Sequence, residues 1–252
     1  MQAYGPAFAR VYNRRWTFFA HGVAPRIAEF YASTSIGQRN RCVLDLCCGT
    51  GQLALALLER GYIVTGIDLS AHMLQYATEN AGAYVEQGQA RFIQADAASF
   101  TLDQRFGLVV STFDALNHLE SQDALRSCFH SVFAVLADNG YFVFDLNTRA
   151  GLHQWNNISV NDTEEAMIVT RGIYDGQSDR AYTMISGFIR LANGLYERFE
   201  ETVFNTAFDM AWVRDTLLEA GWRQIHCARI EDLETPIARP EQEGRVFFVA
   251  HK

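Results

Sequence analysis

An α/β fold with a mainly parallel β-sheet is the architecture that this sequence predicts, and three observations lead to it. Short apolar segments alternate with amphipathic segments between residues 42 and 146, as strands and helices do in a sheet built from right-handed crossovers. The apolar segments contain few polar residues, which is typical of parallel strands buried on both faces. A glycine turn, Gly49-Thr50-Gly51, follows the first apolar segment, and glycine lets the backbone approach a ligand closely.

The alternating part of the chain is predicted to contain five strands and three helices. The strands are expected at residues 42–46, 62–67, 90–95, 106–112 and 141–146, and the helices at 51–60, 70–80 and 122–136. Ser70 is a favourable N-cap for the second of these helices. Residues 3–34 are also expected to be helical, and Pro25 should break this region or begin a second helix.

The pattern changes after the fifth strand. Residues 164–206 contain three long runs rich in β-branched and aromatic residues, separated by Asp175-Gly176 and Asn193-Gly194. Such dipeptides between strand-like runs predict hairpins. We therefore expect an antiparallel sheet of three strands, with a fourth short strand near residues 158–160. The alternating pattern returns with a helix at 210–220 and strands at 223–230 and 245–251.

Composition limits the classes of protein to which the chain can belong. The 252 residues are 49% apolar and carry a net charge of −8 without a basic cluster, which argues against a nucleic-acid partner. The five cysteines show no metal-ligand spacing, so no metal site is expected. No segment approaches the ~20 apolar residues that span a bilayer, and the N-terminus lacks the apolar stretch of a signal peptide. We expect a cytoplasmic protein without membrane partners.

Acidic residues stand where successive predicted strands end. Asp45 precedes the glycine turn, Asp68 ends the second strand and Asp96 ends the third. A glycine turn that opens a helix, followed by an acid one strand later, is typical of a nucleotide-type cofactor site. Residues 49–54, GTGQLA, also match the dinucleotide fingerprint, so a nicotinamide cofactor is an alternative at this point.

The ordered motifs resemble those of class I S-adenosylmethionine-dependent methyltransferases. They are VLDLCCGTG, VTGIDLS, IQADAASF, FGLVVSTFDALNHL and GYFVFDLNT. Within the class, the segments FARVYN, FDALNHL and LYERFEETVF resemble a group of small-molecule N-methyltransferases that includes those acting on amino-deoxysugars. The resemblance implies a three-layer, seven-stranded Rossmann-like sheet of order 3-2-1-4-5-7-6, with strand 7 antiparallel and the antiparallel β insertion after strand 5.

The same resemblance implies a division of the chain into four parts. Residues 1–40 would form a helical lid, and residues 41–150 would form the cofactor-binding core. Residues 151–207 would form the antiparallel insertion that roofs the substrate, and residues 208–252 would complete the core sheet.

S-Adenosylmethionine is the cofactor that the resemblance implies. Asp45 would hold its amino-acid end, Asp68 its ribose hydroxyls and Asp96 its adenine amino group. The full set implied to bind it is Asp45, Cys47, Gly49, Gly51, Asp68, Leu69, Met73, Asp96, Ala97 and Phe113. Cys47 replaces the first glycine of the family turn, which we expect to be tolerated if residue 47 keeps a negative φ.

Methyl transfer requires an acceptor lone pair held close to the donor methyl group. His118, Asn117 and Tyr12 are the catalytic candidates, and His118 is suited to take a proton near neutral pH. Substrate-binding candidates are Tyr4, Asp114, Arg198 and Glu200. A structural histidine, aromatic core contacts and a solvated charged face are the alternatives. Alternation places Arg198 and Glu200 on one face of the last insertion strand and Glu197 and Glu201 on the other.

The predicted function is methyl transfer from S-adenosylmethionine to a small-molecule acceptor, with nitrogen favoured over oxygen. Two alternatives stay open: an NAD(P)-dependent oxidoreductase, and a non-catalytic protein that binds the cofactor as a sensor or partner subunit. The sequence is compatible with a homodimer and identifies neither the acceptor nor the number of methyl groups transferred.

Overall fold

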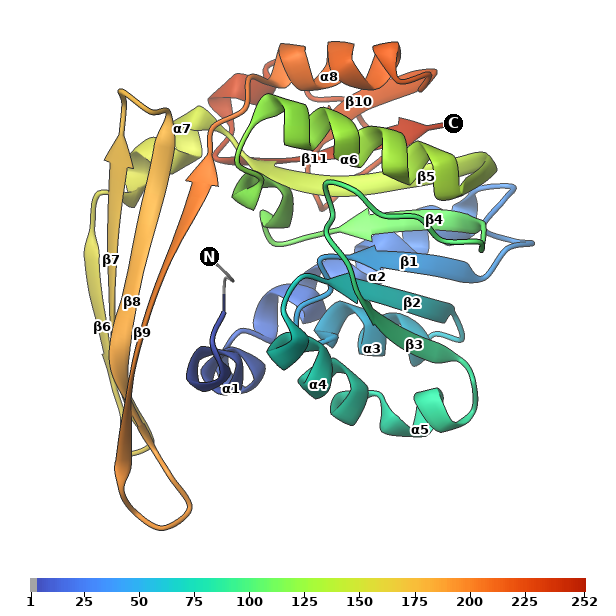
Figure 1. Ribbon diagram of the computed structural model, residues 1–252. Coiled ribbons are helices and arrows are strands. Elements are labelled where there is room, and N and C mark those ends of the chain that lie inside the picture. Colours follow the sequence, from blue (N-terminus) through green and yellow to red (C-terminus); the bar gives the residue numbers. More distant parts are fainter. Residues whose placement is uncertain (1–3) are drawn as a thin grey trace.

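The computed structural model describes residues 4–252, which form two separate β-sheets (Figure 1). The larger sheet has seven strands in the order β3-β2-β1-β4-β5-β11-β10. Strand β11 pairs antiparallel with both β5 and β10, and the other neighbours are parallel. The predicted order 3-2-1-4-5-7-6 with one antiparallel strand is therefore confirmed. The strands are β1 (Cys42–Leu46), β2 (Ile63–Asp68), β3 (Ala90–Gln94), β4 (Phe106–Ser111), β5 (Leu136–Asn147), β10 (Gln224–Ala228) and β11 (Arg245–His251).

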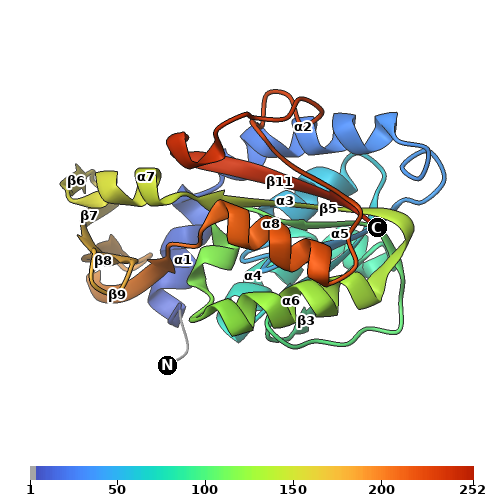
Figure 2. The same cartoon turned by 90° about the horizontal axis from the view of Figure 1, so that it is seen from above.

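Helices cover both faces of this sheet, as Figure 2 shows for α2 and α6. Helices α6 (Gln122–Val135) and α8 (Met210–Glu219) pack on one face, and α2 (Phe18–Ser33) and α3 (Gln52–Leu58) pack on the other. Alternate residues of each strand supply the two cores, so that Leu44 belongs to the first and Val43 to the second. Burial on both faces explains why the strand segments are almost continuously apolar.

Further short elements complete the core. Helices α4 (Ala71–Asn80) and α5 (Gly82–Glu86) connect β2 to β3, and α5 is an element that the sequence pattern did not predict. The 3₁₀ turn η1 (Ala115–His118) follows β4. Helix α7 (Arg149–Leu152) and turn η2 (His153–Trp155) follow β5, and turn η3 (Pro240–Gln242) precedes β11. Strand β5 begins earlier than predicted, and its pairing with β4 is irregular between Phe106 and Leu108.

The second sheet is a four-stranded antiparallel meander of β6 (Ile158–Asp162), β7 (Ala166–Asp175), β8 (Arg180–Arg190) and β9 (Tyr196–Thr206). Both predicted hairpins and the short first strand are confirmed. The sheet stands beyond the carboxyl ends of the parallel core strands, with α1 (Pro6–Arg15) between it and the core (Figure 1). Helix α1 therefore contacts both α4 and β9.

The prediction that Pro25 interrupts the N-terminal helices is wrong. The chain breaks instead at Trp16 and Thr17, and Pro25 lies inside α2. A proline in a helix interior costs about 3 kcal/mol. Helix α2 buries Val23, Ile27 and Tyr31 against the sheet, and each such side chain contributes about 1.5–3 kcal/mol. Burial therefore outweighs the lost backbone hydrogen bond.

Within residues 4–252, every helix is too short or too polar to cross a lipid bilayer.

Candidate active site

The glycine turn after β1 uses left-handed backbone at three positions. Cys47, Gly49 and Gly51 have φ values of 61°, 53° and 75°. The condition of a negative φ at residue 47 is therefore not met, and a side chain in the left-handed region costs about 1–2 kcal/mol. A Cβ atom on Gly51 would lie 2.9 Å from the Cβ of Ala77, so glycine is needed there for packing against α4 as well as for its backbone conformation.

Asp68 fixes the shape of this turn. One carboxylate oxygen accepts a hydrogen bond from the Gly49 amide at 2.9 Å, and the other accepts one from the Ser70 amide at 2.8 Å. Burial raises the pKa of Asp68, and these backbone donors offset part of that rise. The Ser70 hydroxyl caps α4 by accepting from the Met73 amide at 3.4 Å, which confirms the predicted N-cap.

Asp45 presents an acceptor that the protein itself does not satisfy. The side chain is 2% exposed, and its Oδ2 atom has no hydrogen-bond partner among the described residues. Burial, with a smaller contribution from Asp68, raises the pKa of Asp45 to about 8. Thr50 and Ser111, in the turn and at the end of β4, also have unpartnered buried hydroxyls. Buried polar atoms are normally bonded, so these residues fit a polar, ammonium-bearing ligand such as the amino-acid end of S-adenosylmethionine.

The residues predicted to face adenine lie at the ends of β2 and β3. Leu69 is 50% exposed, which leaves an apolar surface beside the turn. Asp96 is exposed and accepts a hydrogen bond from the Ala98 amide at 2.8 Å, the turn-capping role that is its structural alternative. Ala97 and Met73 are buried in hydrophobic clusters.

A cavity of about 430 Å³ lies between α1, the antiparallel sheet and the segment after β4. Its aromatic wall consists of Tyr4, Phe8, Tyr12, Trp16, Phe113 and Trp155. Neutral polar groups of the antiparallel sheet, among them Ser159, Thr170 and Thr183, line the opposite wall, and His118 and Asp114 line it from the segment after β4. The cavity therefore combines ring faces with hydrogen-bonding groups, as ligand sites usually do.

Two tyrosines of the N-terminal region, Tyr4 and Tyr12, line this cavity. The ring of Tyr4 lies 6.1 Å from that of Tyr12 and 6.4 Å from the imidazole of His118. Burial raises the pKa of both phenols, and nearby acidic groups raise it further. The hydroxyls therefore remain protonated near neutral pH and act as hydrogen-bond donors. Phe113, the last residue implied to contact the cofactor, stacks on Phe19 with ring centroids 4.6 Å apart.

His118 is held in one tautomer by the antiparallel sheet. Its Nδ1 lies 2.7 Å from the carbonyl oxygen of Phe204 on β9. A carbonyl only accepts, so Nδ1 carries the hydrogen and the neutral ring keeps its lone pair on Nε2. His118 lines the cavity and can serve there as a proton acceptor.

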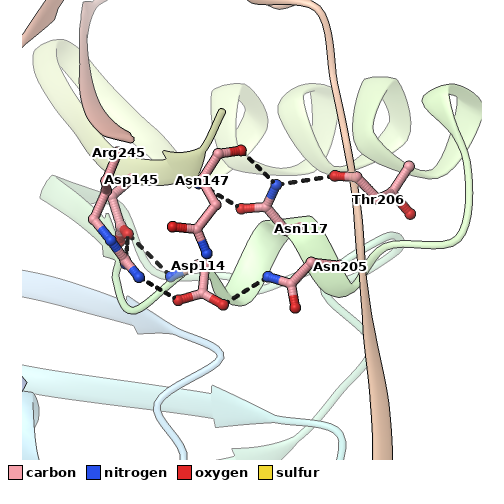
Figure 3. Close-up of polar contacts among 7 residues, drawn as sticks. All are labelled: Asp114, Asn117, Asp145, Asn147, Asn205, Thr206 and Arg245. Carbon is pink, nitrogen blue, oxygen red and sulfur yellow. Dashed lines mark hydrogen bonds and ion pairs between the residues drawn. The ribbon is translucent and has the colours of Figure 1, made fainter. Parts of the chain in front are cut away.

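An ionic network centred on Asp114 lies at the cavity (Figure 3). Arg245 at the start of β11 binds Asp145 and donates to Asp114 Oδ1 at 2.7 Å. Asp114 has a left-handed φ of 52°, and its amide donates to Asp145 at 3.0 Å. Its other carboxylate oxygen accepts from Asn205 Nδ2 at 2.6 Å. The network joins β5, β11 and the loop after β4 to the last strand of the antiparallel sheet.

The geometry does not support a catalytic role for Asn117. The residue is fully buried. Its Nδ2 donates to the carbonyls of Asn147 and Thr206 at 3.1 and 2.9 Å, and its Oδ1 accepts from the Asn147 amide at 2.9 Å. These bonds tie β5 to β9 and leave no group for a substrate.

The prediction that Arg198 and Glu200 bind substrate is contradicted as well. They pair with each other on the outer face of the antiparallel sheet, and their side chains are 61% and 56% exposed. Glu197 and Glu201 share the inner face: Glu197 binds Arg10 at 2.8 Å, and Glu201 accepts from the Gly5 amide at 3.0 Å. The alternation was read correctly, but choosing the other face of a strand reverses every side chain.

Three residues important to the site were missed by the sequence interpretation. Asn205 and Arg245 line the cavity, and Asn13 attaches α1 to the core by accepting from Gln52 and Asn80. The sequence did contain a signal for Asn205. Side chains alternate along a strand, so Asn205 lies on the same face of β9 as the apolar Phe199, and this is the inward face. No three His, Cys, Asp or Glu side chains in residues 4–252 are grouped as a metal site.

Comparison with known proteins agrees with this geometry. Residues 43–140 match the family model described as a methyltransferase domain. YqeM of Bacillus subtilis (strain 168), named as an inferred methyltransferase, is 29% identical over 225 residues, which cover 88% of each chain. An S-adenosylmethionine-dependent methyltransferase from Clostridium acetobutylicum ATCC 824 has a TM-score of 0.79 at 22% identity, over 97% of each chain. The sugar N-methyltransferase KedS8 from Streptoalloteichus sp ATCC 53650 has a TM-score of 0.73 at 21% identity, over 92% of this chain and 87% of KedS8.

The matched domain, the relatives and the fold define the class of the protein. It is an S-adenosylmethionine-dependent methyltransferase with the class I fold. The predicted class and cofactor are confirmed, and the nicotinamide-dependent alternative is set aside.

Proposed function

We propose that the protein methylates an amine nitrogen of a small polar molecule bound in the 430 Å³ cavity, with His118 as the proton acceptor. The observation that carries this proposal is the hydrogen bond from His118 Nδ1 to the Phe204 carbonyl. It fixes the tautomer that has a basic Nε2, on a side chain that lines the cavity. An amine attacks only as the neutral base, so a group that removes its proton favours the reaction.

The unpartnered oxygen of Asp45 supports a cofactor site at the glycine turn, and the resemblance of the sequence supplies the other roles. Asp45 would bind the ammonium group of S-adenosylmethionine, Asp68 the ribose hydroxyls, and Leu69 and Asp96 the adenine. When bound there, the cofactor supplies a methyl group activated by the positive charge of its sulfonium. The protein's own part is to hold the acceptor in line, to keep water out with the rings of Tyr4 and Tyr12, and to take the proton at His118.

Charge in and around the cavity supports nitrogen over oxygen. Asp114 lines the cavity and shares Arg245 with the buried Asp145, and Arg245 is the one cationic side chain among the described residues that line it. Two carboxylates therefore face a single guanidinium. Such an excess of acidic groups attracts a cationic amine more than a neutral alcohol. The structural similarity to KedS8, which is named as a sugar N-methyltransferase, points the same way.

The proposal assigns a function to each of the four parts into which the sequence divides the chain. Residues 1–40 supply the lid through α1, residues 41–150 and 208–252 form the cofactor-binding core, and residues 151–207 roof the acceptor. A cytoplasmic location, the absence of nucleic-acid and membrane partners, and a homodimer remain predictions from the sequence.

Paired acceptors test the choice of nucleophile. Purified protein is incubated with S-adenosylmethionine and either glucosamine or glucose, and either cyclohexylamine or cyclohexanol, while S-adenosylhomocysteine formation is followed. We expect turnover with the amines and none with the matched alcohols. Turnover with the alcohols alone would contradict the proposal, and tight binding of S-adenosylhomocysteine without turnover of any acceptor would favour a sensor.

His118→Asn tests the proton acceptor. An asparagine amide can still donate to the Phe204 carbonyl but has no basic nitrogen, so kcat should fall at least about tenfold. His130→Asn is the matched control, because His130 is exposed on α6 away from the cavity. An unchanged kcat in His118→Asn would return His118 to a structural role.

A further inference from the structure

Asn205 Oδ1 is a buried oxygen at the cavity that has no hydrogen-bond partner among the described residues, and the proposed cofactor contacts do not supply one. Asn205 lies on β9 and is 0% exposed. A buried carbonyl oxygen left without a donor costs about 1–3 kcal/mol. A side chain that retains such an atom at a ligand cavity needs a partner that the protein does not supply.

The orientation of this amide is set by its neighbours. Asn205 Nδ2 donates to Asp114 Oδ2 at 2.6 Å, and the other oxygen of Asp114 accepts from Arg245 at 2.7 Å. A flipped amide would bring its oxygen against the carboxylate, where two acceptors would repel. The oxygen of Asn205 must therefore point away from Asp114, as it does in Figure 3.

The backbone around Asn205 is held equally firmly. The carbonyl of the preceding residue, Phe204, accepts from His118 Nδ1 at 2.7 Å, and the carbonyl of the following residue, Thr206, accepts from Asn117 at 2.9 Å. The Thr206 hydroxyl also donates to the Leu119 carbonyl at 2.8 Å. Three consecutive residues of β9 are thus fastened to the segment after β4, so the unpaired oxygen has a fixed position at the cavity that His118 also lines.

We propose that Asn205 is a substrate-binding residue whose Oδ1 accepts a hydrogen bond from a hydroxyl group of the methyl acceptor, next to the amine that His118 receives. The inference rests on the proposed amine methylation and adds to it a vicinal amino alcohol as the acceptor class. Asp114 and Arg245 are positioning residues in this scheme, because they act through the orientation of the Asn205 amide. A site built to bond a substrate hydroxyl discriminates strongly against the analogue that lacks it.

The experiment compares two acceptors in two proteins. The acceptors are trans-2-aminocyclohexanol and cyclohexylamine, which differ by the neighbouring hydroxyl. The wild-type protein should prefer the amino alcohol by at least about tenfold in kcat/KM, the effect of about 1.4 kcal/mol. Asn205→Ala should lose this preference through a higher KM for the amino alcohol, while the KM for cyclohexylamine and the affinity for S-adenosylhomocysteine stay within about twofold.

Controls separate binding from folding. Asn147→Ala removes a side chain of the same type from β5 of the larger sheet, where Nδ2 has no partner and the residue does not line the cavity, and it should keep the preference. Asn205→Ser is the second variant, because its shorter side chain keeps a polar group at this position but has no oxygen where Oδ1 lies. An intact preference in either Asn205 variant would overturn the proposal and leave Oδ1 to an ordered water.

A binding readout keeps the inference independent of turnover. If no amine is methylated by the wild-type protein, the proposed function fails first, and trans-2-aminocyclohexanol is then titrated calorimetrically into protein saturated with S-adenosylhomocysteine. Binding by the wild-type protein that weakens at least about tenfold in Asn205→Ala would support the role of Asn205. Equal binding by both proteins, or none by either, would overturn it.

Discussion

The unpaired carboxylate of Asp45 predicts that cofactor binding is coupled to a proton. The pKa of Asp45 is raised from 3.8 to about 8, mainly by burial and secondly by Asp68. Near neutral pH about nine-tenths of the cofactor-free protein would then carry a protonated Asp45. An ammonium group of the ligand requires the ionised form. Binding of S-adenosylhomocysteine at about pH 7 should therefore release close to one proton per site.

The size of the pH effect on cofactor affinity follows from the same pKa of about 8 for Asp45. Below a pKa of about 8, the dissociation constant of S-adenosylhomocysteine should rise about tenfold for each unit by which pH falls. Titration calorimetry in two buffers of different ionisation enthalpy measures the released proton directly. Asp45→Asn should bind more weakly and release none from this site. An undiminished proton release in Asp45→Asn, or none in the wild-type protein, would refute the reasoning.

The same carboxyl group also affects stability, with a definite sign. Between about pH 4 and pH 8 the folded protein holds a proton on Asp45 that the unfolded chain has lost. Its contribution to the free energy of unfolding therefore falls as pH rises through this window, by at most about 1.4 kcal/mol per unit. The difference between wild-type protein and Asp45→Asn in urea unfolding, measured across this range without cofactor, isolates the effect. A difference that grows in favour of the wild-type protein with rising pH would contradict it.

Substitutions at four further positions give specific expectations. Cys47→Gly should be more stable to urea than Cys47→Ala by about 0.5–1 kcal/mol, since both lose the thiol but only glycine relieves the left-handed strain; equal stabilities would show that the turn is unstrained. Gly51→Ala should lower the free energy of unfolding by about 1–3 kcal/mol through the clash with Ala77, and an unchanged urea midpoint would count against it. Asn13→Ala should weaken S-adenosylhomocysteine binding at least about threefold in calorimetry by freeing α1 from the core, and unchanged affinity would show that this attachment is dispensable. Arg198→Ala should leave KM and kcat within about twofold, since exposed ion pairs contribute little, and a large rise in acceptor KM would restore its predicted role.

Most element positions could be predicted because burial on both faces leaves a strong pattern in the sequence, whereas the strand order came from the resemblance to class I methyltransferases. The segments at β1, β2 and β4 are apolar throughout, and the hairpins of the antiparallel sheet carry Asp-Gly and Asn-Gly. The prediction of a break at Pro25 fails because the local backbone preference of proline does not include the packing of α2 on the sheet. Burial of α2 against the sheet keeps the helix continuous through Pro25. The residues next to a proline in the sequence do not show which surface the helix will pack on.

Spacing along the chain is more informative about the proposed cofactor residues than about the residues of the acceptor cavity. The turn and its acids occupy fixed places at the ends of successive strands, so spacing along the chain locates Asp45 and Asp68. The acceptor cavity is formed by α1, β9 and β11, which are far apart in sequence. Whether Arg198 or Glu197 faces inward depends on how the antiparallel sheet docks. The orientation of the Asn205 amide depends on Asp114, which is held by Arg245, forty residues further along the chain.

Helix α1 contacts both the seven-stranded core, through α4, and the antiparallel sheet, through β9. Asn13 attaches it above the glycine turn, Arg10 attaches it to the antiparallel sheet, and its rings form one wall of the cavity. In the lid role that we propose for it, α1 closes over the bound methyl donor, and the amine has a complete cavity wall only after this closure. Initial-rate kinetics should accordingly show a compulsory sequence in which the methyl donor binds first and the demethylated product leaves last.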